Sequence, residues 1–166
     1  EASTSLPLIK YGEKYDSTIE PRISLRFNPG DMKDYSQSSR KISASNMFSI
    51  NRLGLTDTFE EGRSLTMGFD YKVENIEDIN KYFEFKIASV LRDNDNQNIP
   101  TSSNIKESGN IIGLVKNNIN KNLDFVYDFS IDNNLQTIEY NSLSANFSLD
   151  KFTTGLKFIE ENGKLG

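Results

Sequence analysis

The strongest constraint on this chain is an alternation of apolar and polar side chains with a period of two. In residues 123–132, LDFVYDFSID, every odd position is large and apolar, and every even position except Val126 is polar. Successive side chains of a β-strand point to opposite faces, so this period predicts a strand with one apolar and one polar face. The class of the protein then depends on what the apolar face touches, a protein core or lipid.

The same alternation recurs along the chain. It predicts strands at residues 18–27, 63–74, 81–91, 123–132, 141–149 and 152–158. No segment combines convincing helix caps with a 3.6-residue period. The chain is therefore predicted to be all-β, an antiparallel up-and-down meander.

Some positions depart from the simple alternation. Ala88 and Val90 blur it at the end of their strand, and residues 110–119 are read as a strand only because they lie between two turn signals. If the second-last strand begins as early as Thr137, its first residues are out of phase with the rest, as a β-bulge causes.

Two connections are long and polar, near residues 28–62 and 92–109, and the others are short. Counted along the meander, both long connections lie at the same end of the strands. Outer-membrane barrels are built in this way, with the long loops outside the cell, and strands of about 9–11 residues match a tilted membrane span. The pattern leaves two interpretations open: about seven or eight strands forming a partial arc of a large transmembrane outer-membrane β-barrel, or an ordinary soluble antiparallel sandwich.

The composition excludes several functions. A net charge of −5 disfavours binding to nucleic acid, and the lack of cysteine and histidine removes disulfides, thiolate metal sites and the usual general base. Residues 93–98 begin like a calcium loop, but Asn98 and Asn104 stand where glycine and glutamate are required, so a flexible polar loop is expected. No phosphate loop or nucleophile motif is present. We expect no enzyme, no catalytic residue, no metal and no cofactor.

The chain begins EASTSL without methionine, and residues 1–10 show no targeting segment. We expect residues 1–166 to be a piece of a longer protein. No run of about 20 apolar residues is available for a transmembrane helix, which leaves membrane strands and a soluble fold both open.

A soluble β-sandwich binding module, secreted or periplasmic, is the alternative, because sandwiches also have period-two strands and some long loops. The polar positions here are mainly Ser, Thr, Asn, Asp and Gly, a mixture that also suits a wet barrel interior. Aromatic residues lie close to strand ends, an arrangement that interfacial girdles or a sandwich core with an exposed edge would both produce: Tyr82, Phe83 and Phe158.

Residues 46–68, NMFSINRLGLTDTFEEGRSLTMG, carry a family resemblance. They resemble a signature of the lipopolysaccharide-assembly outer-membrane family LptD, also called organic solvent tolerance protein, of the form N-L-F-S-x-N-R-x-x-G-x-D-R-x-E-x-G-x-R-x-x-Y-G. The family-signature residues are Asn46, Phe48, Asn51, Arg52, Asp57, Gly62 and Arg63, and Ser49, Gly68 and either Glu60 or Glu61 also match. Met47, Thr58 and Met67 depart from the pattern. IEPRISLRFNPG and LDFVYDFSIDNN resemble other stretches of the family, so the similarity spans most of the chain.

The resemblance implies a non-enzymatic function, the translocation of lipopolysaccharide into the outer leaflet of the bacterial outer membrane. It implies as partners lipopolysaccharide, outer-membrane lipid, an LptE-like lipoprotein plug and, through an N-terminal jelly-roll domain of the parent protein, periplasmic bridge proteins. The family moves its substrate through an opening between the first and last barrel strands. We expect this piece to lack both of these strands and to supply part of the barrel wall, part of the lumen lining and outer loops.

Alternation then assigns side chains to faces of the wall. The residues expected to face the lumen are Ser64, Thr66, Asp70, Lys72, Asp124, Asp128, Ser142, Ser144 and Asn146. Those expected to face lipid are Leu65, Met67, Phe69, Phe125, Phe129 and Phe147.

The signature loop mixes charged and apolar residues, so we expect it to fold back onto the protein. In a barrel it would pack into the mouth as a structural plug, an interpretation favoured over a direct contact with lipopolysaccharide. Arg52 is expected to bridge Asp57 or Glu60. The alternative is a surface ion pair contributing less than about 1 kcal/mol.

Overall fold

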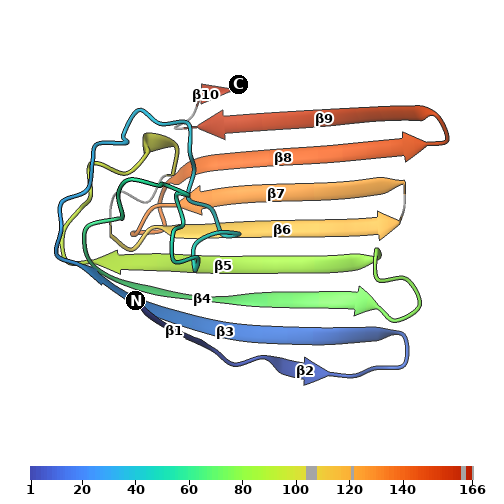
Figure 1. Ribbon diagram of the computed structural model, residues 1–166. Coiled ribbons are helices and arrows are strands. Elements are labelled where there is room, and N and C mark those ends of the chain that lie inside the picture. The colour runs from blue at the N-terminus through green and yellow to red at the C-terminus, as the bar shows by residue number, and fades with distance from the viewer. Residues whose placement is uncertain (104–107, 121, 162–163, 166) are drawn as a thin grey trace.

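The structure, a computed structural model, describes residues 1–103, 108–120, 122–161 and 164–165. Their strands form one ten-stranded antiparallel sheet in the order β1-β3-β4-β5-β6-β7-β8-β9-β10, with β2 also paired to β3 (Figure 1). The strands are β1 (Ala2–Ser5), β2 (Leu8–Lys10), β3 (Tyr15–Asn28), β4 (Gly62–Asn75), β5 (Tyr82–Arg92), β6 (Ile111–Asn120), β7 (Leu123–Ile131), β8 (Ile138–Leu149), β9 (Phe152–Glu161) and β10 (Lys164–Leu165). Apart from the short 3-10 helix η1 (Thr101–Ser103), the described residues contain no helix, and none of them forms one able to cross a membrane.

The predicted all-β, up-and-down meander is confirmed. Each long strand, β3 to β9, pairs with its neighbours in sequence, and the sheet is open, with β1 and β10 at opposite edges. Among the described strands there is no second sheet of the kind that a sandwich needs.

The β-bulge expected near the start of the second-last strand is present. Opposite β7 the pairing jumps from Ser130–Tyr140 to Ile131–Ile138, so Glu139 is the extra residue. The edge strands β1 and β2 were not predicted. Pro7 lies between these short strands, and neither is long enough to show an alternation.

The register gives the sheet one polar and one apolar face, because directly paired residues share a face. Thr66 pairs with Ser24 and Val90 on the polar face, whereas Leu65 pairs with Leu25 and Leu91 on the apolar face. The apolar face is uncovered by any described residue over much of its area, and its large side chains are exposed at Leu25, Phe27, Met67, Leu91, Phe147, Leu149, Leu156 and Phe158.

Close packing on the apolar face is shaped by one glycine. The ring of Phe129 lies directly on Gly113, its cross-strand partner, and a Cβ atom at Gly113 would stand 2.0 Å from that ring. Nearby rings also pack: the ring centroids of Tyr127 and Phe129 are 5.7 Å apart, and so are those of Phe69 and Phe85. A side chain at position 113 would therefore displace Phe129.

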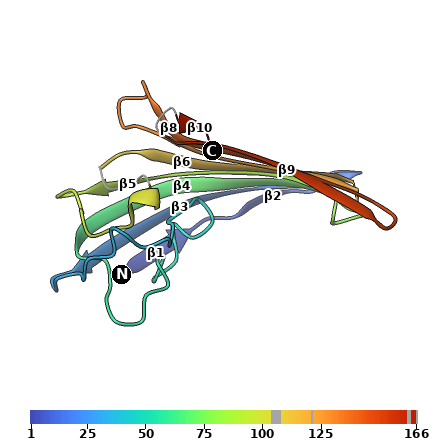
Figure 2. The ribbon, with the colours of Figure 1, turned by 90° about the horizontal axis from the view of Figure 1, so that it is seen from above.

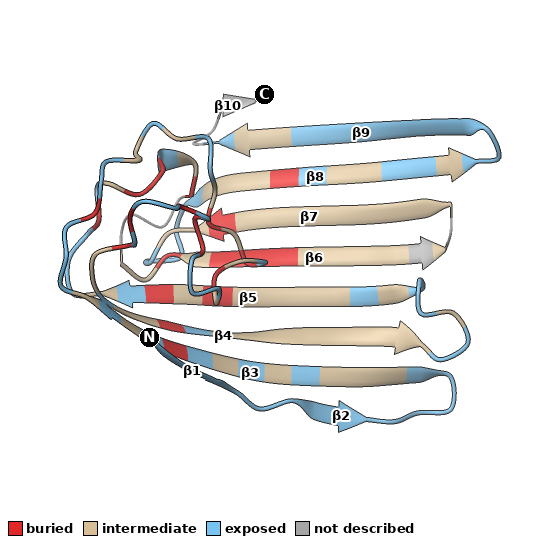
Figure 3. Ribbon diagram, in the orientation of Figure 1, coloured by how far each residue is buried: buried red, intermediate tan, exposed pale blue. Residues whose placement is uncertain are grey.

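The two ends of the strands differ. Both long connections, 29–61 and 93–110, lie at one end, the left of Figure 1, and tight turns lie at the other. Seen from above, the sheet is curved, with the connection 29–61 on one side of it (Figure 2). The buried residues gather at the loop end (Figure 3). The core thus lies between the long connections and the sheet.

Candidate functional site

The two long connections fold together into one unit, which we call the cap: residues 29–61 and the described part of 93–110. Backbone hydrogen bonds join them, from the Tyr35 amide to the Asn98 carbonyl at 2.9 Å and from the Thr101 amide to the Ser36 carbonyl at 3.1 Å. The amide of Ile42 donates to Ser103 Oγ at 2.9 Å. The cap is therefore ordered by its own contacts as well as by the sheet.

The cap packs on the polar face. Its Ile42, Met47 and Ile99 side chains are fully buried in one cluster with Ala88, Val90, Ile112 and Leu114 from the sheet. Those four sheet residues occupy positions of the polar face, since Ala88 pairs with Gly68 and Ile112. The blurred alternation in the sequence is explained, because polar-face positions become apolar where the cap covers them.

At the centre of the cap, Arg52 and Glu60 form a bidentate ion pair. Arg52 Nε donates to Glu60 Oε2 at 2.5 Å, and Nη2 donates to Oε1 at 2.6 Å. The side chains are 1% and 6% exposed. Of the two partners expected for Arg52, Asp57 and Glu60, the structure pairs it with Glu60, and this burial excludes the alternative of a weak surface pair.

Two strand arginines complete what we call the arginine cluster, which is Arg26, Arg52 and Arg92 around Glu60. Arg92, at the end of β5, bonds to Glu60 Oε1, and Arg26, near the end of β3, donates to Glu60 Oε2 at 3.2 Å. Arg26 also pairs with Glu1 at 3.2 Å and donates to the Ser49 carbonyl at 2.7 Å. One carboxylate thereby ties the signature loop to two strands.

The cluster sets the charge state of Glu60. Burial is the largest single influence and by itself would raise the pKa of this carboxyl. The charges and hydrogen bonds of Arg52 and Arg92 together outweigh burial and lower the pKa of Glu60 to about 2. Glu60 is therefore ionised at neutral pH.

Asp57, the other predicted partner of Arg52, bonds elsewhere. Its carboxylate accepts from Lys33 Nζ at 2.7 Å and from the Tyr35 hydroxyl at 2.6 Å. The hydrogen bond from Lys33, followed by that from Tyr35, lowers the pKa of Asp57. Its side chain is 42% exposed, so this group of three side chains lies on the solvent-exposed side of the cap.

The other signature residues shape the loop. Asn46 accepts from the Ser43 amide at 2.8 Å and donates to the Lys41 carbonyl at 2.9 Å. Asn51 accepts from the Leu55 amide at 3.0 Å and donates back to the Leu55 carbonyl. These Asx contacts stabilise turns, which is the usual work of asparagine in loops.

The remaining signature residues connect the loop to the sheet. The guanidinium of Arg22 lies 4.8 Å from the centre of the Phe48 ring, a cation–π contact on the polar face. Gly62 has a φ of +82° where the loop enters β4, a conformation that favours glycine. Arg63, the next residue, belongs to the apolar face, because it pairs with Phe27.

Beyond the cap, the polar face carries a row of ion pairs that crosses four strands. This belt consists of Glu20, Arg22, Asp70, Lys86, Glu84 and Lys116. Asp70 lies at its centre, 3.3 Å from Arg22 and 3.2 Å from Lys86. Glu84 continues it, 3.2 Å from Lys86 and 3.6 Å from Lys116.

The register places the nine residues that the sequence assigns to the lumen on this same polar face: Ser64, Thr66, Asp70, Lys72, Asp124, Asp128, Ser142, Ser144 and Asn146. The six residues assigned to lipid, Leu65, Met67, Phe69, Phe125, Phe129 and Phe147, lie on the opposite face. That one face meets a lumen and the other lipid stays a prediction.

Sequence reasoning missed Arg26 and Arg92. Both occupy polar-face positions, since each pairs with Ser64. Their place in the alternation of β3 and β5 was the sequence signal that could have identified them. The connection at 92–109 is not polar throughout, because Ile99 and Pro100 are buried against the rest of the cap. Asn104, one of the two residues that argued against a calcium loop, lies outside the described residues. Within the described ranges no group of acidic residues is arranged to hold a metal ion.

Fold and site together define a class of protein: an open antiparallel meander with one apolar and one polar face, the polar one capped by folded loops at one end. A family model for LptD, described as LPS transport system D, matches residues 4–158. The chain belongs to the LptD family, outer-membrane components of lipopolysaccharide transport in Gram-negative bacteria. No curated protein matches the chain. The resemblance read from residues 46–68 is thus confirmed.

Proposed function

We propose that this chain forms part of the wall of an outer-membrane LptD barrel, through which lipopolysaccharide is assembled into the outer leaflet. Its apolar face meets lipid and its polar face lines the lumen. The observation that carries the proposal is the contrast between the faces: bare apolar side chains on one, and on the other an ion-pair belt and a folded cap. A water-soluble protein would leave the apolar face exposed at a large cost in free energy.

The height of the apolar band supports this orientation. On β4 the band runs from Val73, near the tight turns, to Leu65, near the cap. At about 3.3 Å per residue and a strand tilt of about 40°, this distance corresponds to about 20 Å of depth, close to the apolar band of known outer-membrane barrels. Long loops in such barrels face the outside, so the cap stands at the external end.

The cap would then serve as a fixed part of the lumen wall. It reaches from Arg26 on β3 to Tyr140 on β8, whose ring lies 3.1 Å from Lys41 Nζ. The arginine cluster holds it against the sheet from inside. In this position the cap narrows the outer mouth and keeps it closed to solutes. A direct contact with lipopolysaccharide is not required of these residues.

The uncovered part of the polar face supports the proposed partners. Its belt of alternating charge offers hydrogen bonds to the sugars of lipopolysaccharide or to an LptE-like lipoprotein plug. Delivery of the substrate by periplasmic bridge proteins would depend on a further domain, as the family resemblance implies. The role proposed here is non-enzymatic: the described polar face would supply binding groups and an ordered wall.

Photo-cross-linking tests the orientation in the protein expressed from its complete gene in its own bacterium. Benzoylphenylalanine replaces Phe125 on the apolar face or Ser144 on the polar face, at neighbouring positions of β7 and β8. We expect Phe125 to cross-link membrane phospholipid, and Ser144 to cross-link newly made lipopolysaccharide or a lipoprotein. Phospholipid captured at Ser144 and not at Phe125 would reverse the faces and overturn the proposal.

A further inference from the structure

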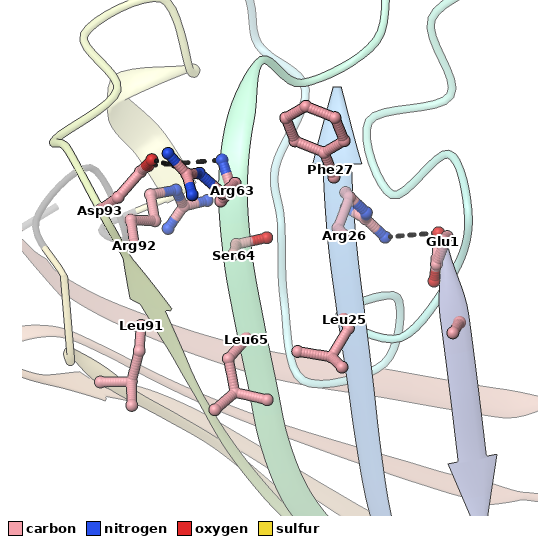
Figure 4. A pocket seen from close by; sticks show the side chains of 11 residues that line it. Glu1, Leu25, Arg26, Phe27, Arg63, Ser64, Leu65, Leu91, Arg92 and Asp93 are labelled. Atoms are coloured by element: carbon pink, nitrogen blue, oxygen red, sulfur yellow. Dashed lines mark hydrogen bonds and ion pairs between the residues drawn. The ribbon is translucent and has the colours of Figure 1, made fainter. Parts of the chain in front are cut away.

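The apolar face is hollowed at its cap end. The hollow has a volume of about 630 Å³ and lies beside the ends of β3, β4 and β5. Figure 4 shows its floor, a row formed by Leu25, Leu65 and Leu91, with Arg63 and Asp93 above that row. Phe27 flanks Arg63, its cross-strand partner. The hollow thus has an apolar floor and a charged rim.

Arg63 is held in place yet open to solvent. Its Nε lies 3.2 Å from Asp93 Oδ2, and its amide donates to Asp93 Oδ1 at 3.3 Å. The side chain is 75% exposed. In the part of the chain that the structure describes, the two terminal nitrogens of its guanidinium have no partner. The carboxylate therefore orients the guanidinium and leaves four N–H donors available.

The height of Arg63 on the sheet is specific. It stands two residues beyond Leu65, the last residue of the apolar band on β4, and therefore about 7 Å further along the strand. In the proposed orientation, this is where the acyl chains of the outer leaflet end and its headgroups begin. A headgroup phosphate at this level would meet the guanidinium while the acyl chains of the same lipid lie in the leucine-floored hollow.

We propose that this hollow is a binding site for lipopolysaccharide that already resides in the outer leaflet, on the outside of the wall. Arg63 binds a phosphate of the lipid anchor through its free guanidinium edge, the arrangement in which arginine recognises phosphate best. The leucine row and Phe27 receive the acyl chains. The groups that would bind the lipid belong to the apolar face, although Arg26, Ser64 and Arg92 of the polar face also line the hollow. The inference rests on the transport proposal for the direction of the membrane.

The test uses the same complete protein with benzoylphenylalanine at Leu65. Irradiation is expected to attach lipopolysaccharide, and Arg63→Gln, which removes the charge and most of the donors, is expected to reduce this product about tenfold. Arg63→Lys keeps the charge and loses the planar fork, so it should give an intermediate yield. Lys33→Gln is the matched control, because Lys33 is also an exposed cation paired with an aspartate and lies in the cap. It should leave the yield unchanged.

A second arm identifies the group that is bound. The purified protein is mixed with lipopolysaccharide before and after enzymatic removal of its anchor phosphates, and only the phosphorylated form is expected to depend on Arg63. Equal yields from native protein and Arg63→Gln, or equal yields with and without phosphate, would overturn the inference. The phospholipid product at Phe125 is followed in every variant. If phospholipid is attached at Phe125, the wall is folded and faces lipid. A missing lipopolysaccharide product at Leu65 then overturns only the inference about the hollow. A missing phospholipid product at Phe125 in the native protein counts against the proposed function itself.

Discussion

Arg52 holds Glu60 through two parallel hydrogen bonds of 2.5 and 2.6 Å, and both side chains are almost completely buried between the cap and the sheet. These residues are eight positions apart in the signature loop, and their pair also binds β3 and β5 through Arg26 and Arg92. Buried pairs are not large sources of net stability, but breaking one leaves an uncompensated charge. The pair therefore makes the closed cap sensitive to single substitutions.

Removing the carboxylate charge should open the cap more than removing Arg52. Glu60→Gln leaves three arginines around a neutral amide, whereas Arg52→Met leaves Glu60 with Arg26 and Arg92. We expect Glu60→Gln to destabilise the cap by about 3–5 kcal/mol. Limited proteolysis within residues 29–61 of the folded protein measures this. Asp57→Asn is the control, because the pairs of Asp57 with Lys33 and Tyr35 lie on the solvent-exposed side of the cap, where water screens them and they contribute little. Equal opening of the cap by Glu60→Gln and Asp57→Asn would contradict the role given to burial.

Acid should release the cap. The pKa of Glu60 is about 2 in the folded protein, below its ordinary value of 4.5, so protonation works against the closed state. The contribution of Glu60 to stability is complete above about pH 4.5 and is lost as the pH falls toward 2. Amide hydrogen exchange in residues 47–60, measured from pH 7 down to pH 3 and corrected for intrinsic rates, should show protection falling below pH 4.5. In Glu60→Gln the loss of protection on acidification should shrink to the smaller part that Asp57 contributes, because the pKa of Asp57 is also lowered. A pH dependence of the same size in Glu60→Gln would assign the effect to another group.

The apolar contact between cap and sheet should be as important as the charges. Ile42 is 0% exposed in the cluster that joins the cap to Ala88 and Val90, whereas Ile50 of the same loop is 72% exposed. Ile42→Ala should destabilise the cap by about 2–5 kcal/mol through lost burial and a cavity. Ile50→Ala should change it by less than about 0.5 kcal/mol. Proteolysis of the loop compares the two, and similar cleavage rates would mean that the cluster does not hold the cap.

Gly113 should not tolerate a side chain. A Cβ atom there would lie 2.0 Å from the Phe129 ring, so Gly113→Ala forces this ring to move and should cost about 1–3 kcal/mol in sheet stability. Denaturant unfolding of the protein in detergent measures the loss. Gly30→Ala is the matched control, because the nearest atom to its Cβ is a flexible Asn28 side chain at 3.4 Å. The double variant Gly113→Ala with Phe129→Ala should recover part of the stability, and failure to do so would show that the ring is not the obstacle.

The sequence by itself determined the strands and their two faces. A period of two is a local property, and it specifies which side chains share a face once the strands pair in order, as Leu65 with Leu25 and Leu91 illustrate. Residues 46–68 were also enough to indicate the LptD family. The short edge strands β1 and β2 escaped this reasoning because a few residues carry too little pattern.

Only the tertiary structure decided the composition of the arginine cluster and the packing of the cap. Glu60 is 34 residues from Arg26 and 32 from Arg92, and no local pattern chooses among partners at that distance. The choice between Asp57 and Glu60 for Arg52 was likewise made by burial, because only Glu60 lies beneath the loop while Asp57 faces solvent. Ala88 and Val90 disturb the alternation of their strand, and only the position of the cap, which covers them, explains why they are apolar. Contacts between distant segments depend on how a whole loop folds onto the sheet, and alternation along one strand does not encode that.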